Sequence, residues 1–211
     1  MNINSFEKII TEAWDNKGQV NSKSYKPNGP VQQTMVRIKK DNKMIVQIPI
    51  IKEIPVFILL RALGIESDRD IINYIAYDET DLDMVNLIRI SLNDTINPDS
   101  EEQEKILTQD DAIDFLTTKM RIFRKYAEHD KDIKQQQKRM HLLKLLNTSF
   151  LPHIDSDLAH KGVYLCYMIN KLLKRALGRM PIDDRDSYVN KRVDLPGDLI
   201  MELIKQHYKK M

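Results

Sequence analysis

The sequence predicts an α+β fold, a predominantly helical domain of six to seven helices with a small antiparallel β-hairpin near residues 34–48. Apolar residues alternate with the two-residue period of a strand only in that short stretch. After residue 50 they recur at the three- to four-residue spacing of helices. The 211 residues, 42% hydrophobic and 30% charged, can bury a sizeable core, and this composition excludes collagen-like, mucin-like and wholly disordered chains.

The alternation in the hairpin favours one register. A two-residue loop would place apolar side chains of the two arms on opposite faces, whereas a three-residue loop over residues 40–42 keeps them on one face. This register pairs Ile38 with Met44, Val36 with Val46 and Thr34 with Ile48. It also puts Asn42 in the left-handed conformation, which asparagine tolerates.

Start and stop signals delimit the helices. Ser67 and Thr108 each precede a helical pattern as its N-cap. Gly64 and Gly178 each follow the last residue of another helical pattern and end it. The expected helices are Pro55–Leu63, one after Ser67, one opened by Asp81, one after Thr108, Asp132–Phe150, Leu158–Leu177 and one from Pro196 to the end.

Composition divides the chain into three parts. Residues 1–30 are polar and turn-rich and are predicted to be a connector or a cloning boundary; residues 31–180 form the folded domain; residues 181–211 are a charged loop followed by a helix. No apolar run approaches the roughly 20 residues of a membrane helix. A single cysteine and a first segment without a secretory pattern predict an intracellular protein.

Charge is distributed unevenly along the chain. Residues 1–77 carry a net charge of +3, residues 78–114 a net charge of −10 and residues 115–211 a net charge of +9. Two surfaces that prefer different partners would explain this pattern, and so would two solvated faces.

The usual chemical motifs are missing from the sequence. The histidines and Cys166 show no zinc-ligand spacing, and the six glycines form neither of the common phosphate-binding loops. The acidic runs lack the spacing of a calcium loop. Cys166 lies within an apolar helical stretch, which favours a packed thiol over a nucleophile. We therefore predict no catalytic residue and no metal site.

One loop, residues 183–192, combines acids, bases, an amide and a tyrosine. It could be an ion-paired loop that holds the last helix. Alternatively it contacts nucleic acid, with Lys191 and Arg192 neutralising phosphates, Asp186 or Asn190 reading a base edge and Tyr188 stacking. Its pattern alone does not decide between the two.

An ordered series of motifs resembles the second-largest subunit of multisubunit DNA-dependent RNA polymerases of the eukaryotic and large-DNA-virus type. The resemblance covers roughly residues 30–211. The motifs are IPVFILLRALG (54–64), SDRDI (67–71), IAYD (75–78), AIDF (112–115), FLPHI (150–154), YMINKLL (167–173), DDRD (183–186) and NKR (190–192).

The resemblance implies that residues 31–180 are the lobe domain and that residues 181–211 lead toward the protrusion and fork of a several-fold longer subunit. The chain alone would then have no nucleotidyltransferase activity and no cofactor, because the catalytic Mg²⁺ is bound mainly by the largest subunit. The compartment would be the nucleus, a cytoplasmic viral factory or a virion.

The resemblance also implies partners. A lobe lines the cleft for downstream or forked DNA and receives initiation factors and a small zinc-containing subunit beside the largest subunit. Asp186, Asn190, Lys191 and Arg192 are the DNA-proximal candidates, although the family usually has His and Gly where this chain has Ser187 and Val189. The acidic stretch, residues 78–114, suits a basic protein partner. Its candidate residues are Glu79, Asp81, Asp83, Glu101, Glu102 and Glu104.

Two other functions are compatible with the residues taken alone. One is a free-standing acidic interaction module unrelated to transcription. The other is a self-contained hydrolytic enzyme, which the absence of a visible nucleophile–base pair disfavours.

Overall fold

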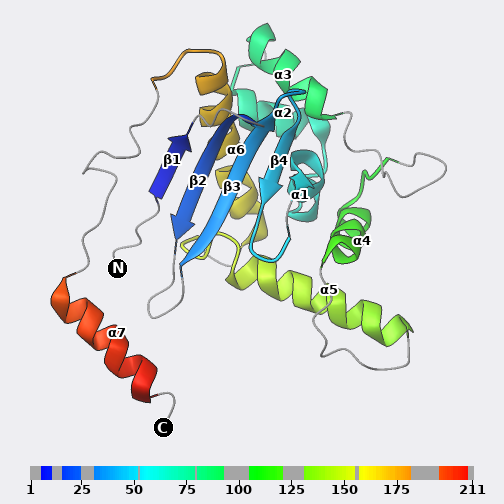
Figure 1. Cartoon of the computed structure of the whole chain (residues 1–211). Helices are drawn as coiled ribbons and strands as arrows, with labels where there is room; N and C mark the ends of the chain where they lie inside the picture. Colours follow the sequence, from blue (N-terminus) through cyan, green and yellow to red (C-terminus); the bar gives the residue numbers. More distant parts are fainter. Residues whose placement is uncertain are drawn as a thin grey trace.

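A five-stranded antiparallel sheet with strand order β1-β2-β3-β4-β5 forms one layer of the computed structural model (Figure 1). The strands are β1 (Phe6–Ile10), β2 (Asn16–Ser24), β3 (Gln32–Lys39), β4 (Met44–Gln47) and β5 (Ile54–Pro55). The structure describes residues 6–10, 16–24, 31–51, 53–78, 80–92, 105–120, 131–154, 157–181 and 195–208.

The hairpin between β3 and β4 has the predicted register. Ile38 pairs with Met44 and Val36 with Val46, and the paired residues end at Met35–Gln47, so the predicted Thr34–Ile48 pair lies beyond the ladder. Asn42 has φ 63°, which confirms the left-handed residue of a three-residue loop. The Asn42 amide donates to the carbonyl of Lys39 at 3.0 Å and closes the turn.

Two strands lie where the sequence predicts a turn-rich connector. β2 runs antiparallel along β3, with Val20 opposite Val36, and β1 adds to the outer edge of β2. The sequence did not predict β2, because its buried residues Gln19, Asn21 and Ser22 are polar and show no apolar alternation typical of a strand. The division of the chain at residues 30 and 180 stays a prediction.

Seven helices are present in the described part of the chain, and the α+β class with a dominant helical content is confirmed. They are α1 (Val56–Ala62), α2 (Asp68–Ala76), α3 (Leu82–Leu92), α4 (Gln109–Lys119), α5 (Lys131–Thr148), α6 (Leu158–Ala176) and α7 (Pro196–Tyr208).

Side-chain caps begin several helices as the sequence predicts. The Ser67 hydroxyl accepts from the Asp70 amide and starts α2, and the Thr108 hydroxyl accepts from the Asp111 amide and starts α4. At the other end of α1, Gly64 has φ 99°, a conformation that a side chain would strain.

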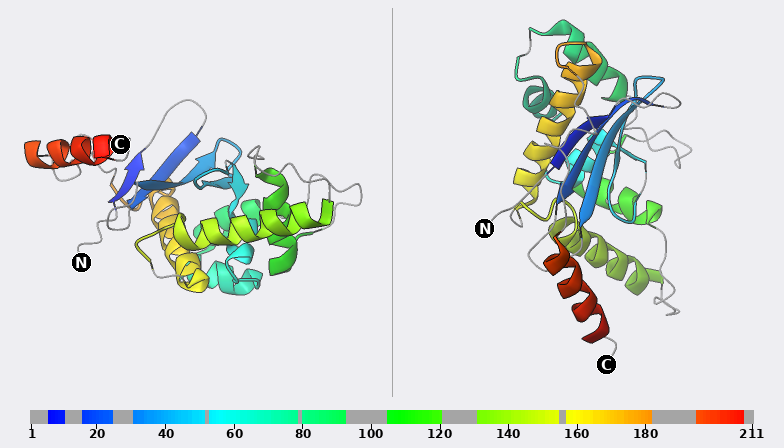
Figure 2. Two further views of the ribbon diagram at one scale, coloured as in Figure 1. Left: turned by 90° about the horizontal axis from the view of Figure 1, so that it is seen from below. Right: turned by 60° about the vertical axis from the view of Figure 1, so that its left-hand side comes forward.

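Apart from α7, the helices lie on one side of the sheet (Figure 2). α6 packs against β2 and β3, α1 packs against β4 and β5, and α4 lies between α1 and α5. The core joins sheet residues such as Val36 and Val46 to Phe57, Leu165 and Ile169, all essentially inaccessible to solvent.

Some helix faces are rotated from the predicted ones. Leu82 and Met140, for which helical spacing predicts burial, are each 69% exposed, while Met84 and Leu142 are buried instead. In each helix the buried apolar residue lies two positions after the exposed one, so spacing alone did not select the buried residue.

Two fully buried cations hold separate elements together. Arg61 donates to the Ile106 carbonyl and to the Asp68 carboxylate. Lys161 in α6 donates three hydrogen bonds of 2.8 Å to the carbonyls of Leu146, Asn147 and Phe150 at the end of α5. Both charges are bound to the backbone or an acid of the same chain, as buried charges must be.

α7 stands apart from the layers in both figures and has no buried residue. Its apolar side chains Leu199, Ile200, Leu203 and Ile204 are each more than half exposed. Among the described residues, no helix is long and apolar enough to cross a membrane.

Candidate interaction surfaces

Most of the predicted site residues lie outside the described residues. These are the DNA-proximal candidates Asp186, Asn190, Lys191 and Arg192 and the acidic candidates Glu79, Glu101, Glu102 and Glu104. The structure therefore places two of the predicted residues, Asp81 and Asp83, and both lie at the start of α3.

Asp78 and Asp81 organise the turn before α3. One carboxylate oxygen of Asp78 accepts from the amide and the hydroxyl of Thr80, at 2.9 and 2.7 Å, and these bonds lower the pKa of Asp78. Asp81 Oδ1 accepts from the Met84 amide at 3.3 Å, as an N-cap does. Part of the acidic stretch thus serves the start of a helix.

Arg179 connects this acidic turn to the end of α6. Its guanidinium binds both carboxylate oxygens of Asp81, with Nη2 to Oδ1 at 3.0 Å, and lies 3.5 Å from Asp83 Oδ2. The hydrogen bond from Arg179 is the largest cause of the lowered pKa of Asp81. The Asp83 side chain is 75% exposed, so its charge is offered to solvent.

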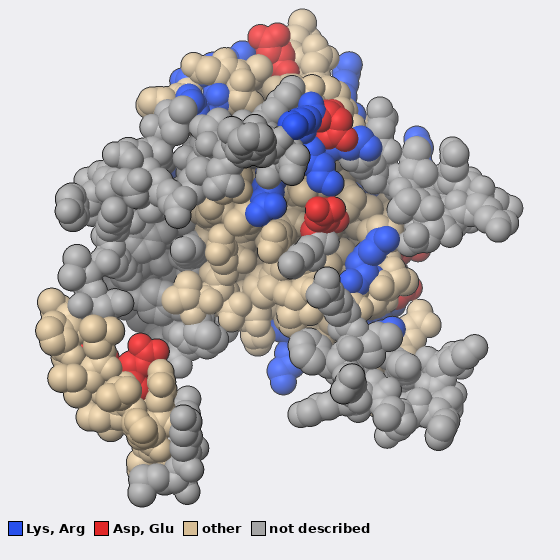
Figure 3. All heavy atoms as spheres, in the orientation of Figure 1, with Lys and Arg blue, Asp and Glu red and all other residues tan. Residues whose placement is uncertain are grey.

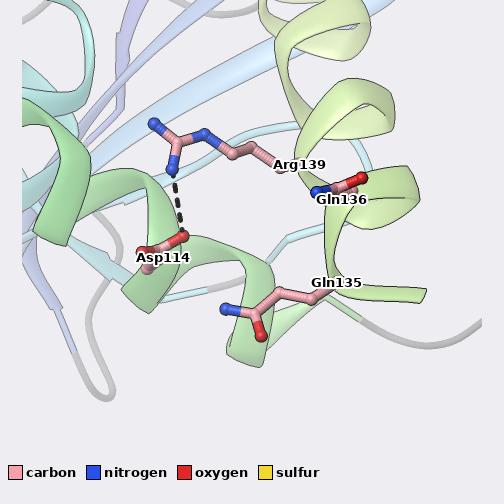
Figure 4. A pocket seen from close by; sticks show the side chains of 4 residues that line it. All are labelled: Asp114, Gln135, Gln136 and Arg139. Atoms are coloured by element: carbon pink, nitrogen blue, oxygen red, sulfur yellow. Dashed lines mark ion pairs between the residues drawn. The ribbon is translucent and has the colours of Figure 1, made fainter. Parts of the chain in front are cut away.

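A polar cleft of about 380 Å³ lies between α4 and α5 (Figure 4). Asp114, Gln135, Gln136 and Arg139 line it. Arg139 Nη1 lies 3.6 Å from Asp114 Oδ1, and the same guanidinium binds Asp110. Amides and an ion pair can hydrogen-bond a peptide but supply no nucleophile, so the cleft offers recognition chemistry.

The sequence gives little indication of this cleft. Arg139 and Gln135 fall on the polar face of α5, where they read as solvated residues. The only hint in the sequence is that Asp110 and Asp114 are four residues apart and share a face of α4. Which basic residue they face depends on the packing of two helices.

Cys166 is packed in the core, as predicted. Its side chain is inaccessible to solvent, and burial raises the pKa of the thiol to about 12. Within the part of the chain that the structure describes, no group of three or more His, Cys, Asp or Glu side chains is placed to hold a metal ion.

On the face drawn in Figure 3, the described charged residues do not form one broad patch of a single sign. Lys and Arg side chains lie there beside isolated acidic ones. Among the described ion pairs, Lys39 Nζ at the end of β3 lies 3.4 Å from Glu53 Oε2. Charge separation along the sequence is therefore greater than charge separation on this face.

Comparison with known proteins gives one family. Residues 8–194 match the family described as RNA polymerase Rpb2, domain 2. DNA-directed RNA polymerase subunit 2 of Acanthamoeba polyphaga mimivirus is 36% identical over 197 residues, which cover 87% of this chain and 16% of that relative. DNA-directed RNA polymerase II subunit 2 of Arabidopsis thaliana is 37% identical over 171 residues, covering 75% of this chain and 12% of the relative.

An archaeal relative agrees. Subunit Rpo2 of the RNA polymerase of Saccharolobus shibatae is 33% identical over 183 residues, covering 85% of this chain and 14% of that protein. The chain thus spans 12–16% of the length of these three relatives. The family match begins within β1 and ends after α6, and the chain belongs to the RNA polymerase Rpb2 domain 2 family, the lobe region of the second-largest polymerase subunit.

Proposed function

We propose that this chain acts as a lobe in a DNA-directed RNA polymerase, forming part of the wall of the DNA cleft and a docking surface for other proteins. The observation that carries the proposal is the family match across residues 8–194. It favours this role over a free-standing acidic module, because the match covers the acidic stretch together with the rest of the domain.

The lobe positions other molecules and does not itself catalyse. Arg61 and Lys161, which could in principle bind phosphate, are consumed by intramolecular hydrogen bonds. The Cys166 thiol is buried and stays protonated at neutral pH, since its pKa is about 12. The proposal assigns Mg²⁺ mainly to the largest subunit and no cofactor to this chain.

The basic part of the chain faces DNA in this proposal. Residues 115–211 have a net charge of +9, which suits a polyanion. Lys191 and Arg192 neutralise phosphates of downstream or forked DNA, and Asp186 or Asn190 lies beside a base.

The acidic part faces proteins. Exposed acids such as Asp83 attract basic surfaces of an initiation factor or of a small zinc-containing subunit. The largest subunit is the principal neighbour, and the assembly works in the nucleus, a viral factory or a virion.

Salt-dependent DNA binding tests the proposal. The 211-residue chain and its variant Lys191→Glu/Arg192→Glu are titrated with fluorescent forked DNA between 50 and 200 mM salt, and affinity is read by anisotropy. Loss of two phosphate contacts should reduce the slope of log K against log salt by about 1.8. Affinity at low salt should fall at least tenfold.

The matched control is Arg89→Glu/Lys105→Glu, which changes the net charge equally on two exposed residues of the acidic stretch. It should leave the slope unchanged. Equal effects of the two double variants would show that only net charge matters, and a flat salt dependence of the unsubstituted chain would refute the DNA contact.

A further inference from the structure

A strip of aromatic and basic side chains runs along the outer side of α6 and onto the end of α2. Its most exposed members are Tyr77, Val163 and Tyr167, with 63%, 43% and 37% of their surface accessible. We define the aromatic strip as His153, Tyr77, Val163, Tyr164, Tyr167, Lys171 and Lys174. α2 packs directly against α6, so the two parts of the strip are neighbours.

Ring contacts link several members of the strip. The His153 and Tyr164 rings meet edge to face with centroids 5.0 Å apart, and the Tyr164 and Tyr167 centroids are 6.0 Å apart. The Lys171 ammonium lies 4.8 Å from the centre of the Tyr167 ring. Each contact is within the range of an aromatic or cation–π interaction.

Tyr77 joins the strip from α2. The Lys174 ammonium lies 5.9 Å from the centre of its ring. The pKa of the Tyr77 phenol is raised, first by partial burial and then by the neighbouring Cys166 and Tyr167 groups. A phenol is protonated at neutral pH even at its ordinary pKa of about 10, so the Tyr77 hydroxyl can donate a hydrogen bond there.

The backbone conformation of Tyr77 at the end of α2 does not require an aromatic side chain. Tyr77 has φ 60° at the C-cap of α2, and its amide donates to the Asn73 carbonyl at 3.0 Å. Glycine or asparagine would adopt this conformation with less strain than a bulky aromatic residue. A strained residue with a largely exposed ring points to a role outside the fold.

The charges around the strip select the kind of ligand. Lys171 and Lys174 provide positive charge beside the rings, Asp78 follows Tyr77 in the sequence, and Asp157 caps the N-terminus of α6. A long phosphate backbone following the strip would meet these carboxylates. A short segment with one or two acids and a large apolar side chain would not.

We propose that the aromatic strip is a docking site for an acidic, aromatic-containing peptide segment of a partner protein. The proposal rests on the proposed function, in which the domain docks other proteins, but it uses a surface separate from the acidic stretch and from residues 183–192. Carboxylates of the segment pair with the two lysines, and its apolar side chain packs on Tyr77 and Tyr167.

Selection from a random library of 12-residue peptides on the 211-residue chain tests the proposal. Enriched peptides should combine Asp or Glu with Phe, Trp or Tyr. The affinity of an enriched peptide should fall at least tenfold in Lys171→Glu/Lys174→Glu and stay within twofold in the control Lys138→Glu/Lys144→Glu on α5. The variant Tyr77→Asn removes the ring and places a residue suited to the positive φ, so it should weaken binding at least fivefold without lowering the melting temperature.

The proposal would be overturned by no enrichment, by enrichment of basic peptides, or by binding that the strip variants do not alter. A 12-nucleotide oligo(dT) that displaces the peptide at equal concentration would assign the strip to nucleic acid instead. Forked-DNA affinity is measured on the same variants. Loss of peptide binding with normal DNA binding would separate this site from the DNA contact. The peptide-docking proposal and the DNA-binding proposal can therefore be refuted independently.

Discussion

Replacing Lys161 by methionine removes a buried ammonium and keeps most of the side-chain volume. In the structure this ammonium donates 2.8 Å hydrogen bonds to the carbonyls of Leu146, Asn147 and Phe150. These are carbonyls at the end of α5, which no further helical turn can satisfy. Lys161 therefore closes α5 from within a neighbouring helix.

The size of the effect follows from burial. Two of the three hydrogen bonds, those to Leu146 and Phe150, are buried, so water does not replace the lost donor there. A buried unsatisfied polar group costs about 1–3 kcal/mol, and two such groups give a loss of about 2–6 kcal/mol. Domains of this kind have about 5–15 kcal/mol in total, so the variant should be close to unfolding.

Urea unfolding followed by circular dichroism at pH 7 measures this loss. Lys144→Met is the matched control, because Lys144 is exposed on α5, and its free energy of unfolding should change by less than about 0.5 kcal/mol. A loss below about 1 kcal/mol for Lys161→Met, with an unchanged m value, would refute the reasoning that this ammonium caps α5.

Three further outcomes are expected. Asp81→Asn keeps a capping side chain but loses the ion pair with Arg179. Since the pKa of Asp81 is lowered in the folded protein, the carboxylate stabilises the fold above about pH 4, and this advantage over Asn disappears as pH falls below that value. A difference in urea midpoints between the two proteins that persists at pH 2.5 would contradict this. Gly64→Ala should cost about 1–2 kcal/mol because of its positive φ, whereas Gly197→Ala, in a helix with open space around it, should cost nothing by the same urea assay. Cys166 should resist a thiol reagent at pH 8 until urea unfolds the chain, and fast labelling of the native protein would contradict its burial.

Local chemistry made much of the fold predictable. Ser67 and Thr108 cap their helices, and Asn42 takes the left-handed position, because each choice depends on a few neighbouring residues. The hairpin register followed from the requirement that paired apolar residues share a face.

Features that depend on distant packing were not predictable. β2 is buried between two strands, yet Gln19, Asn21 and Ser22 carry no apolar alternation that would reveal it. Lys161 follows His160 on a helix and looks like a solvated residue, but the end of α5 surrounds it. In both cases the environment comes from another part of the chain, and a local pattern carries no information about it.

The ion pairs change what the uneven charge along the sequence means. Asp81 and Asp83 belong to the segment of net charge −10, and Arg179, which binds them, belongs to the segment of net charge +9.

A second bridge of the same kind lies between α4 and α5, where Arg139 contacts Asp110 and Asp114. Two arginines of the basic segment thus face four of the twelve acids of the acidic segment. These acids and bases therefore form ion pairs within the domain, which join α3 to the end of α6 and α4 to α5. A basic partner consequently meets a weaker field than the sequence suggests, and its affinity must come from the remaining exposed acids together with shape and apolar contact.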